Sequence, residues 1–117
     1  MDRRMEPRML CADLIDVFWK DKRGRNHSAL ANLEDIASSG ACIQMDTPVP
    51  RETLVRLAHS RAELRGRVRY CVFRETGYFL GVDFEPDSRW NRSRFRPKHM
   101  LDPRSLMRSL TRAANAR

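Results

Sequence analysis

Alternating apolar and polar residues mark several short stretches between positions 9 and 84 of the chain. The clearest stretch covers residues 64–72, where arginines alternate with apolar residues over the first half. Successive side chains of a strand point to opposite faces, so this segment is predicted to be a half-buried antiparallel strand with a cationic outer face. Its inward residues are predicted to be Leu64, Gly66, Val68, Tyr70 and Val72, and its outward ones Arg65, Arg67 and Arg69.

Five further segments show a comparable pattern, and turn-forming residues separate them. In the first of these, Asp13 interrupts an otherwise apolar face. Residues 29–36 also fit a helix, because periodicity alone does not decide between the two structures there. The sequence predicts an all-β fold, a small six-stranded antiparallel barrel, with strands at residues 9–20, 27–36, 41–45, 53–58, 64–72 and 78–84.

The last quarter of the chain has a different character. Between residues 87 and 100, five basic side chains surround Trp90 and Phe95, and this aromatic pair is predicted to anchor the tail to the barrel. Residues 103–114 follow an Asp-Pro start signal and place leucines at helical spacing, which predicts an amphipathic helix. The predicted organisation is a flexible N-terminal arm at 1–8, a barrel at 9–86, and a basic tail with a C-terminal helix at 87–117.

The turn between the second and third predicted strands carries the first candidate chemistry. Asp35 precedes the sequence Ser38-Ser39-Gly40, and an apolar strand follows directly. Asp and Ser side chains bond their own backbone and Gly supplies positive φ, so a sharp bend is expected. These residues alone fit a simple hairpin cap, and they also fit a carboxylate held beside backbone N–H groups for a polar ligand.

This turn and the N-terminus together resemble the PilZ domain, a family of bacterial receptors for the second messenger cyclic di-GMP. That family carries an RxxxR motif in a mobile N-terminal segment and a [D/N]xSxxG motif about one strand pair later. Arg4 and Arg8 match the first motif, Asp35 and Gly40 match the second, and Ala37 stands where the family has Ser. The resemblance covers roughly residues 4–86, because similar residues also occur at 33–36, 66–68 and 78–84.

The resemblance implies that cyclic di-GMP binds at Arg3, Arg4, Arg8, Asp35, Ala37 and Gly40. An arginine fork can meet guanine O6 and N7, or two phosphate oxygens. The Asp35 carboxylate is an acceptor only and suits the guanine N1–H and N2–H₂ donors, while the Gly40 turn would let the backbone approach the ligand. The missing hydroxyl at Ala37 removes a hydrogen bond to a charged group worth roughly 1.5–3 kcal/mol. In this family an arginine just before RxxxR accompanies a stacked pair of ligands, so Arg3 implies two molecules per chain.

The net charge of the chain also indicates an anionic partner. The 117 residues carry a formal net charge of +8, and all basic residues except Lys20, Lys22 and Lys98 are arginines. Arginine pairs bidentately with phosphate and with guanine, so a nucleotide, a nucleic acid or an anionic membrane surface is expected as the partner. The sequence shows no apolar run long enough to span a membrane and no signal peptide, so a cytoplasmic location is expected.

The sequence offers no catalytic or metal-binding constellation. The three cysteines (Cys11, Cys42 and Cys71) are widely spaced and lie in predicted strands, which indicates buried reduced thiols. Two hypotheses follow. The chain is either a non-enzymatic cyclic di-GMP receptor that relays binding to an unidentified downstream protein, or a degenerate PilZ-like module that has lost the nucleotide and acts as a basic protein- or nucleic-acid-binding adaptor.

Overall fold

The computed structural model describes residues 8–60, 62–88, 90 and 100–101. Six strands account for most of this part of the chain, and they match the six predicted from the alternation of residues. A short 3₁₀ turn, η2 (Pro86–Ser88), and a two-residue strand, β7 (Met100–Leu101), follow them. The six strands are β1 (Met9–Lys20), β2 (Asn26–Ala37), β3 (Gly40–Met45), β4 (Leu54–His59), β5 (Ala62–Arg74) and β6 (Gly77–Phe84).

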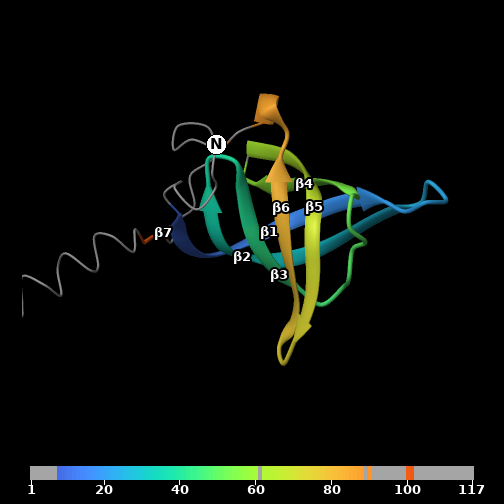
Figure 1. Ribbon diagram of the computed structural model, residues 1–117, viewed down its shortest axis with the longest axis horizontal. Helices are drawn as coiled ribbons and strands as arrows, with labels where there is room; N and C mark the ends of the chain where they lie inside the picture. The colour runs from blue at the N-terminus through green and yellow to red at the C-terminus, as the bar shows by residue number, and fades with distance from the viewer. Residues whose placement is uncertain (1–7, 61, 89, 91–99, 102–117) are drawn as a thin grey trace, which may run out of the picture.

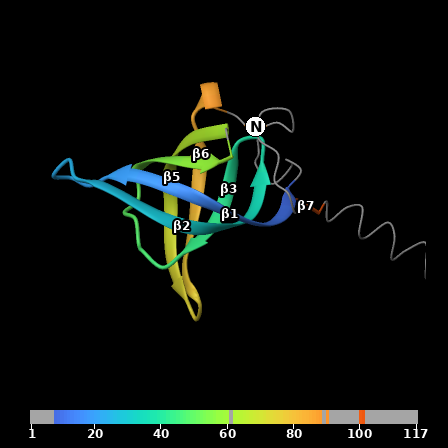
Figure 2. The same cartoon turned by 180° about the vertical axis from the view of Figure 1, so that it is seen from behind.

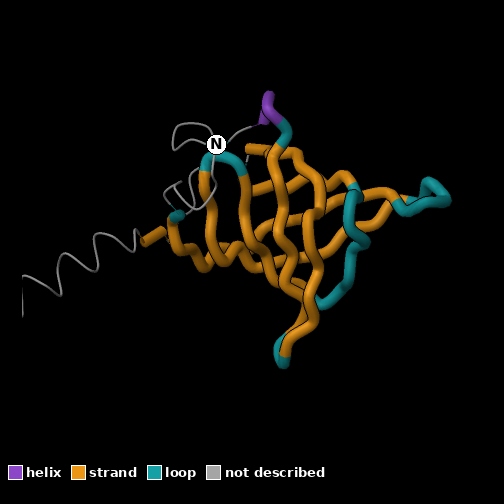
Figure 3. The backbone as a smooth tube through the Cα atoms, in the orientation of Figure 1, coloured by secondary structure: helices purple, strands orange, loops and turns teal. Residues whose placement is uncertain are grey.

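The strands form a closed antiparallel barrel (Figures 1 and 2). Their order is β2-β3-β6-β5-β4-β1, and a further β2–β1 pairing closes the sheet. The predicted barrel is thus confirmed, and residues 29–36 form a strand rather than a helix. The β1–β2 and β5–β6 hairpins project beyond the body of the barrel (Figure 3). The predicted C-terminal helix at 103–114 and the N-terminal arm up to residue 7 lie outside the described residues.

Apolar side chains on the inner face of every long strand form one core. Burial along β1 alternates as predicted, with Ile15, Val17 and Trp19 inside. Trp90 is 7% exposed and belongs to this core, which agrees with its predicted role as an anchor, whereas Phe95 lies outside the described residues. The strands are therefore held mainly by burial of apolar surface on one side of the sheet.

Asp13, which interrupts the apolar face of β1, is itself buried and lies beside His59 of the adjacent strand β4. Its Oδ2 lies 3.2 Å from Nε2 of His59 at the end of β4, and the Asp13 side chain is 2% exposed. A buried carboxylate is costly without a partner, so the His59 ring explains why an acid is tolerated on the inner face.

The prediction for the inner face of β5 is wrong after Val68. The β5–β6 register shifts between Val68 and Tyr70, so Arg69 is the extra residue of a β-bulge. A one-residue shift exchanges the two faces of a strand, and Tyr70 and Val72 are consequently 41% and 43% exposed. Before the bulge the prediction is confirmed: Leu64, Gly66 and Val68 are buried, and Arg65 and Arg67 are exposed.

Candidate functional site

Asp35 lies near the end of β2, between two neighbouring strands. It pairs with Leu10 of β1 on one side and with Cys42 of β3 on the other. The β2–β3 register shifts between Leu33 and Asp35, which makes Glu34 the extra residue of a second bulge. Bulges redirect side chains and are common beside functional sites.

Arg8 contacts Asp35 directly, although the two residues are far apart in the sequence. Arg8 Nη1 donates a hydrogen bond to Asp35 Oδ1 at 2.6 Å, and their side chains are 47% and 23% exposed. The pairing of Leu10 with Asp35 brings the start of β1 beside the end of β2, which explains the contact. The structure thus joins one residue of the RxxxR motif to the acid of the second motif, while Arg3 and Arg4 lie outside the described residues.

The turn after Asp35 is a two-residue hairpin loop of Ser38 and Ser39, flanked by the Ala37–Gly40 pair. The Ser38 carbonyl accepts a hydrogen bond from Trp90 N at 2.9 Å, and the Ser39 carbonyl accepts one from Phe84 N at 2.8 Å. These bonds tie the loop to the end of β6 and to Trp90. The loop therefore has a clear structural role in joining distant parts of the chain.

Gly40 does not have the positive φ that the turn chemistry predicted. Among the described residues the glycines with positive φ are Gly24 and Gly77. Gly40 is needed for a different reason: a Cβ at this position would lie 2.5 Å from the carbonyl oxygen of Val82 in β6. The close approach that Gly40 permits is that of a neighbouring strand, and Ala37 opposite it is only 2% exposed.

A row of paired residues continues from Asp35 across three further strands. Asp35 pairs with Cys42 of β3, Cys42 with Gly81 of β6, and Gly81 with Tyr70 of β5. The Tyr70 ring lies where a side chain of Gly81 would be, and its hydroxyl donates a weak bond to Cys42 Sγ at 3.7 Å. Sequence reasoning missed Tyr70, because only the bulge at Arg69 turns it outward.

Burial and nearby charge raise the pKa values of the groups in this row. Partial burial raises the pKa of Tyr70 to about 12, and its bond to Cys42 and the charge of Asp35 act in the same direction. The pKa of Cys42 is also raised, chiefly by burial. Both groups are therefore neutral near pH 7, where they serve as a hydroxyl donor and a thiol rather than as nucleophiles.

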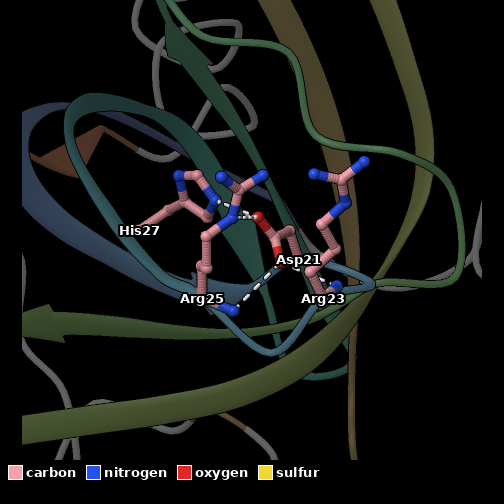
Figure 4. Close-up of polar contacts among 4 residues, drawn as sticks. All are labelled: Asp21, Arg23, Arg25 and His27. Atoms are coloured by element: carbon pink, nitrogen blue, oxygen red, sulfur yellow. Dashed lines mark hydrogen bonds and ion pairs between the residues drawn. The ribbon is translucent and has the colours of Figure 1, made fainter.

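A second polar cluster organises the tip of the β1–β2 hairpin (Figure 4). The Asp21 carboxylate accepts hydrogen bonds from the backbone N–H groups of Arg23 and Arg25 and from Arg25 Nε, at 2.8 to 3.0 Å. Nε2 of His27 lies 2.8 Å from Asp21 Oδ2. The His27 bond, followed by the backbone bonds, holds the pKa of Asp21 well below its usual range. Asp21 thus holds the loop in place, with Arg23 and Arg25 on either side of its carboxylate (Figure 4).

This hairpin also forms one wall of a cleft of about 1130 Å³. The opposite wall comes from residues 50–56 and from Arg65, Gly66 and Glu85. Inside the cleft the rings of Trp19 and His27 are stacked with centroids 5.5 Å apart. Basic lining residues outnumber the acidic ones, which are Asp21, Glu52 and Glu85; the basic ones are Lys20, Lys22, Arg23, Arg25, Arg51, Arg56 and Arg65.

The described part of the chain holds no group of three or more His, Cys, Asp or Glu side chains placed to bind a metal ion. All three cysteines are free thiols in strands. The sequence predicts that they are buried, but in the structure each is only half-buried. Burial and the charges of Asp13 and Asp35 raise the pKa of Cys11 to about 12. In the same described residues, none of the helices is both long and apolar enough to cross a bilayer.

Three comparisons with known proteins were informative to different degrees, and a solved structure supports the fold of this chain. No protein-family model matches the sequence. No curated protein matches it either. Among solved structures, the chain is similar to the MrkH–c-di-GMP complex of K. pneumonia, with a TM-score of 0.55 and 17% sequence identity. The match covers all of this chain and 57% of that protein, so this chain spans a little over half the length of its structural neighbour and shares its fold.

Proposed function

We propose that this protein is a non-enzymatic receptor that binds cyclic di-GMP beside the Arg8–Asp35 ion pair. The observation that carries the proposal is the 2.6 Å contact between these two side chains, one from each motif that the sequence singles out. A cationic fork and an acceptor-only carboxylate are the two groups needed to bind a guanine on both its O6/N7 and its N1/N2 edges. One solved structure with a similar fold is the MrkH–c-di-GMP complex, and its ligand supports the choice of cyclic di-GMP.

Ligand binding at this site begins as an exchange of partners. Arg8 and Asp35 interact through one hydrogen bond in the ion pair, and both are partly exposed, so a ligand can reach them. A guanine would take the Asp35 carboxylate through its N1–H and N2–H₂ groups, and Arg8 would turn to guanine O6 and N7 or to a phosphate. Arg3 and Arg4 supply further guanidinium groups from the arm, and Ala37 and Gly40 border the site.

The exchange also suggests how binding is relayed. Arg8 directly precedes β1, so moving its guanidinium from Asp35 to the ligand alters the path of the arm. A ligand shifts the population of conformations only through contacts that differ between them, and the Arg8 contact is such a difference. We propose that a downstream protein recognises the ligand-bound position of the arm.

The Asp35→Asn variant tests the site. The amide keeps the shape of the side chain but replaces one acceptor oxygen with an NH₂ donor and removes the charge. The affinity for cyclic di-GMP should therefore fall about tenfold, which corresponds to the loss of one good contact with a base edge. Asp16→Asn is the matched control, because Asp16 is exposed on the outer face of β1. Equal affinities for Asp35→Asn and the parent chain would place the ligand elsewhere.

The second candidate function is that of a basic adaptor, and the cationic cleft under the β1–β2 hairpin favours it. Seven basic side chains line that cleft against three acidic ones, and Asp21 already interacts with Arg25 and His27. Binding driven by such charge weakens steeply with salt. Fluorescence anisotropy of a labelled single-stranded oligonucleotide distinguishes the adaptor function from the receptor function. If the cleft binds nucleic acid, the Arg23→Glu and Arg25→Glu variants should bind the oligonucleotide more weakly than the parent chain. Those variants should leave cyclic di-GMP binding unchanged.

A further inference from the structure

Tyr70 occupies an unusual position on the outer surface of the barrel. Its ring lies over Gly81, at the place where any larger residue would put its side chain, and it still remains 41% exposed. The ring therefore rests on the backbone of β6 and presents apolar aromatic surface to the solvent.

The cross-strand register connects this ring to the Arg8–Asp35 ion pair. Asp35, Cys42 and Gly81 occupy paired positions on three adjacent strands. Neighbouring strands lie about 4.8 Å apart, so this row spans about 10 Å. Tyr70 reaches back along it from β5 until its hydroxyl touches Cys42, the direct neighbour of Asp35. The ring and the ion pair thus border the same area of surface, and the Cys42 side chain lies between them.

We propose that the Tyr70 ring is the surface on which a guanine of the ligand stacks. The inference rests on the proposed function and adds a residue to that site. A base laid over the ring would direct its polar edge along the row toward Asp35 and Arg8, the groups that match that edge. Aromatic rings bind the faces of bases regardless of their edges. Tyr70 would therefore provide affinity for the planar base, and the ion pair would provide selectivity for guanine.

A purely structural role for Tyr70 is the competing explanation. An aromatic side chain that covers a glycine on a neighbouring strand stabilises a sheet without any ligand. The Tyr70→Leu variant separates the two roles, because leucine still covers Gly81 with apolar surface but offers no ring. Tyr70→Phe keeps the ring and removes the hydroxyl. Phe73→Leu is the matched control, since Phe73 is an exposed aromatic residue of the same strand that packs against Tyr78.

The experiment is calorimetric titration of cyclic di-GMP into these full-length variants, with thermal unfolding recorded for each. Tyr70→Leu should bind about tenfold more weakly, while Tyr70→Phe and Phe73→Leu bind like the parent chain. Gly81→Ala should also weaken binding, because its Cβ displaces the ring, and it should add nothing in the Tyr70→Leu background.

The outcomes separate this inference from the proposed function. Parent-like affinity of Tyr70→Leu would overturn the stacking role alone. Weak binding by Tyr70→Phe would assign the contact to the hydroxyl and would also overturn it. Absence of binding by the parent chain would overturn the proposed function and the stacking role with it. If Tyr70→Leu fails to fold, the comparison of Gly81→Ala with the parent chain decides the question.

Discussion

The Arg8 guanidinium and the Asp35 carboxylate form an ion pair of 2.6 Å across 27 positions of sequence. Both groups have hydrogen-bonding capacity that a nucleotide would use, and here one hydrogen bond joins them. Because the pair is partly exposed, it contributes little to the stability of the fold. Its position beside Cys42, Gly81 and Tyr70 places the pair on the surface to which we assign ligand binding.

Removing either arginine of the RxxxR motif should weaken cyclic di-GMP binding. Arg8→Ala and Arg4→Ala should each lower affinity by roughly tenfold or more, the value of a bidentate contact. Thermal unfolding should change little for Arg8→Ala, because an exposed pair is worth at most about 1 kcal/mol. Arg74→Ala at the far end of β5 is the control. Parent-like affinity for both arm variants would exclude the arm from the site.

Ala37→Ser should tighten binding. A hydroxyl at this position restores the family pattern, and one net hydrogen bond is worth about 1 kcal/mol. Ala37 is only 2% exposed, so unfolding must be measured in parallel, since a hydroxyl buried without a partner would destabilise the fold. Unchanged or weaker affinity would show that the site is built around alanine.

Two molecules of cyclic di-GMP should bind each chain. Arg3 provides a third guanidinium beside Arg4, and a stacked ligand pair brings four phosphodiester charges that need a strongly cationic site. Titration at protein concentrations well above the dissociation constant measures the number of ligand molecules bound per chain. The Arg3→Leu variant should reduce that number to one. A break at one equivalent for the parent chain would rule out the stacked pair.

Gly40→Ala should destabilise the barrel far more than Gly24→Ala. The new Cβ at position 40 would lie 2.5 Å from the Val82 carbonyl oxygen, so two strands must separate. Gly24 has a φ of +78° and open space around it, so alanine there costs only about 1–2 kcal/mol of backbone strain. Chemical unfolding of both variants checks the difference. A similar decrease in the free energy of unfolding for both variants would mean that β3 and β6 adjust easily around position 40.

Stability should fall in alkaline solution as the Cys11 thiol ionises. Burial raises the pKa of Cys11 from its ordinary value of 9.0 to about 12. The unfolded chain therefore loses this proton at lower pH than the folded chain, so the stabilisation is present below about pH 9 and is lost between about pH 9 and about pH 12. Urea unfolding across this range should show a shallower decline for Cys11→Ala. An identical pH profile would assign the decline to other groups.

The sequence predicts the strands well because alternation of apolar and polar residues is a local property. The two motifs also identify Arg8 and Asp35, although the contact between these residues depends on the β1–β2 register. The prediction for Tyr70 is wrong because the bulge at Arg69 arises from pairing with β6 and leaves no local signal. The contact of Asp13 with His59 and the packing of Gly40 against Val82 likewise join residues distant in sequence.

Calorimetric titration of the parent chain with cyclic di-GMP, with GMP as the control, tests the central claim most directly. The Arg8–Asp35 site predicts saturable binding of cyclic di-GMP and much weaker binding of GMP, which presents one guanine and one phosphate instead of two of each. No heat of binding, or equal affinity for the two nucleotides, would contradict the assignment of this protein as a cyclic di-GMP receptor.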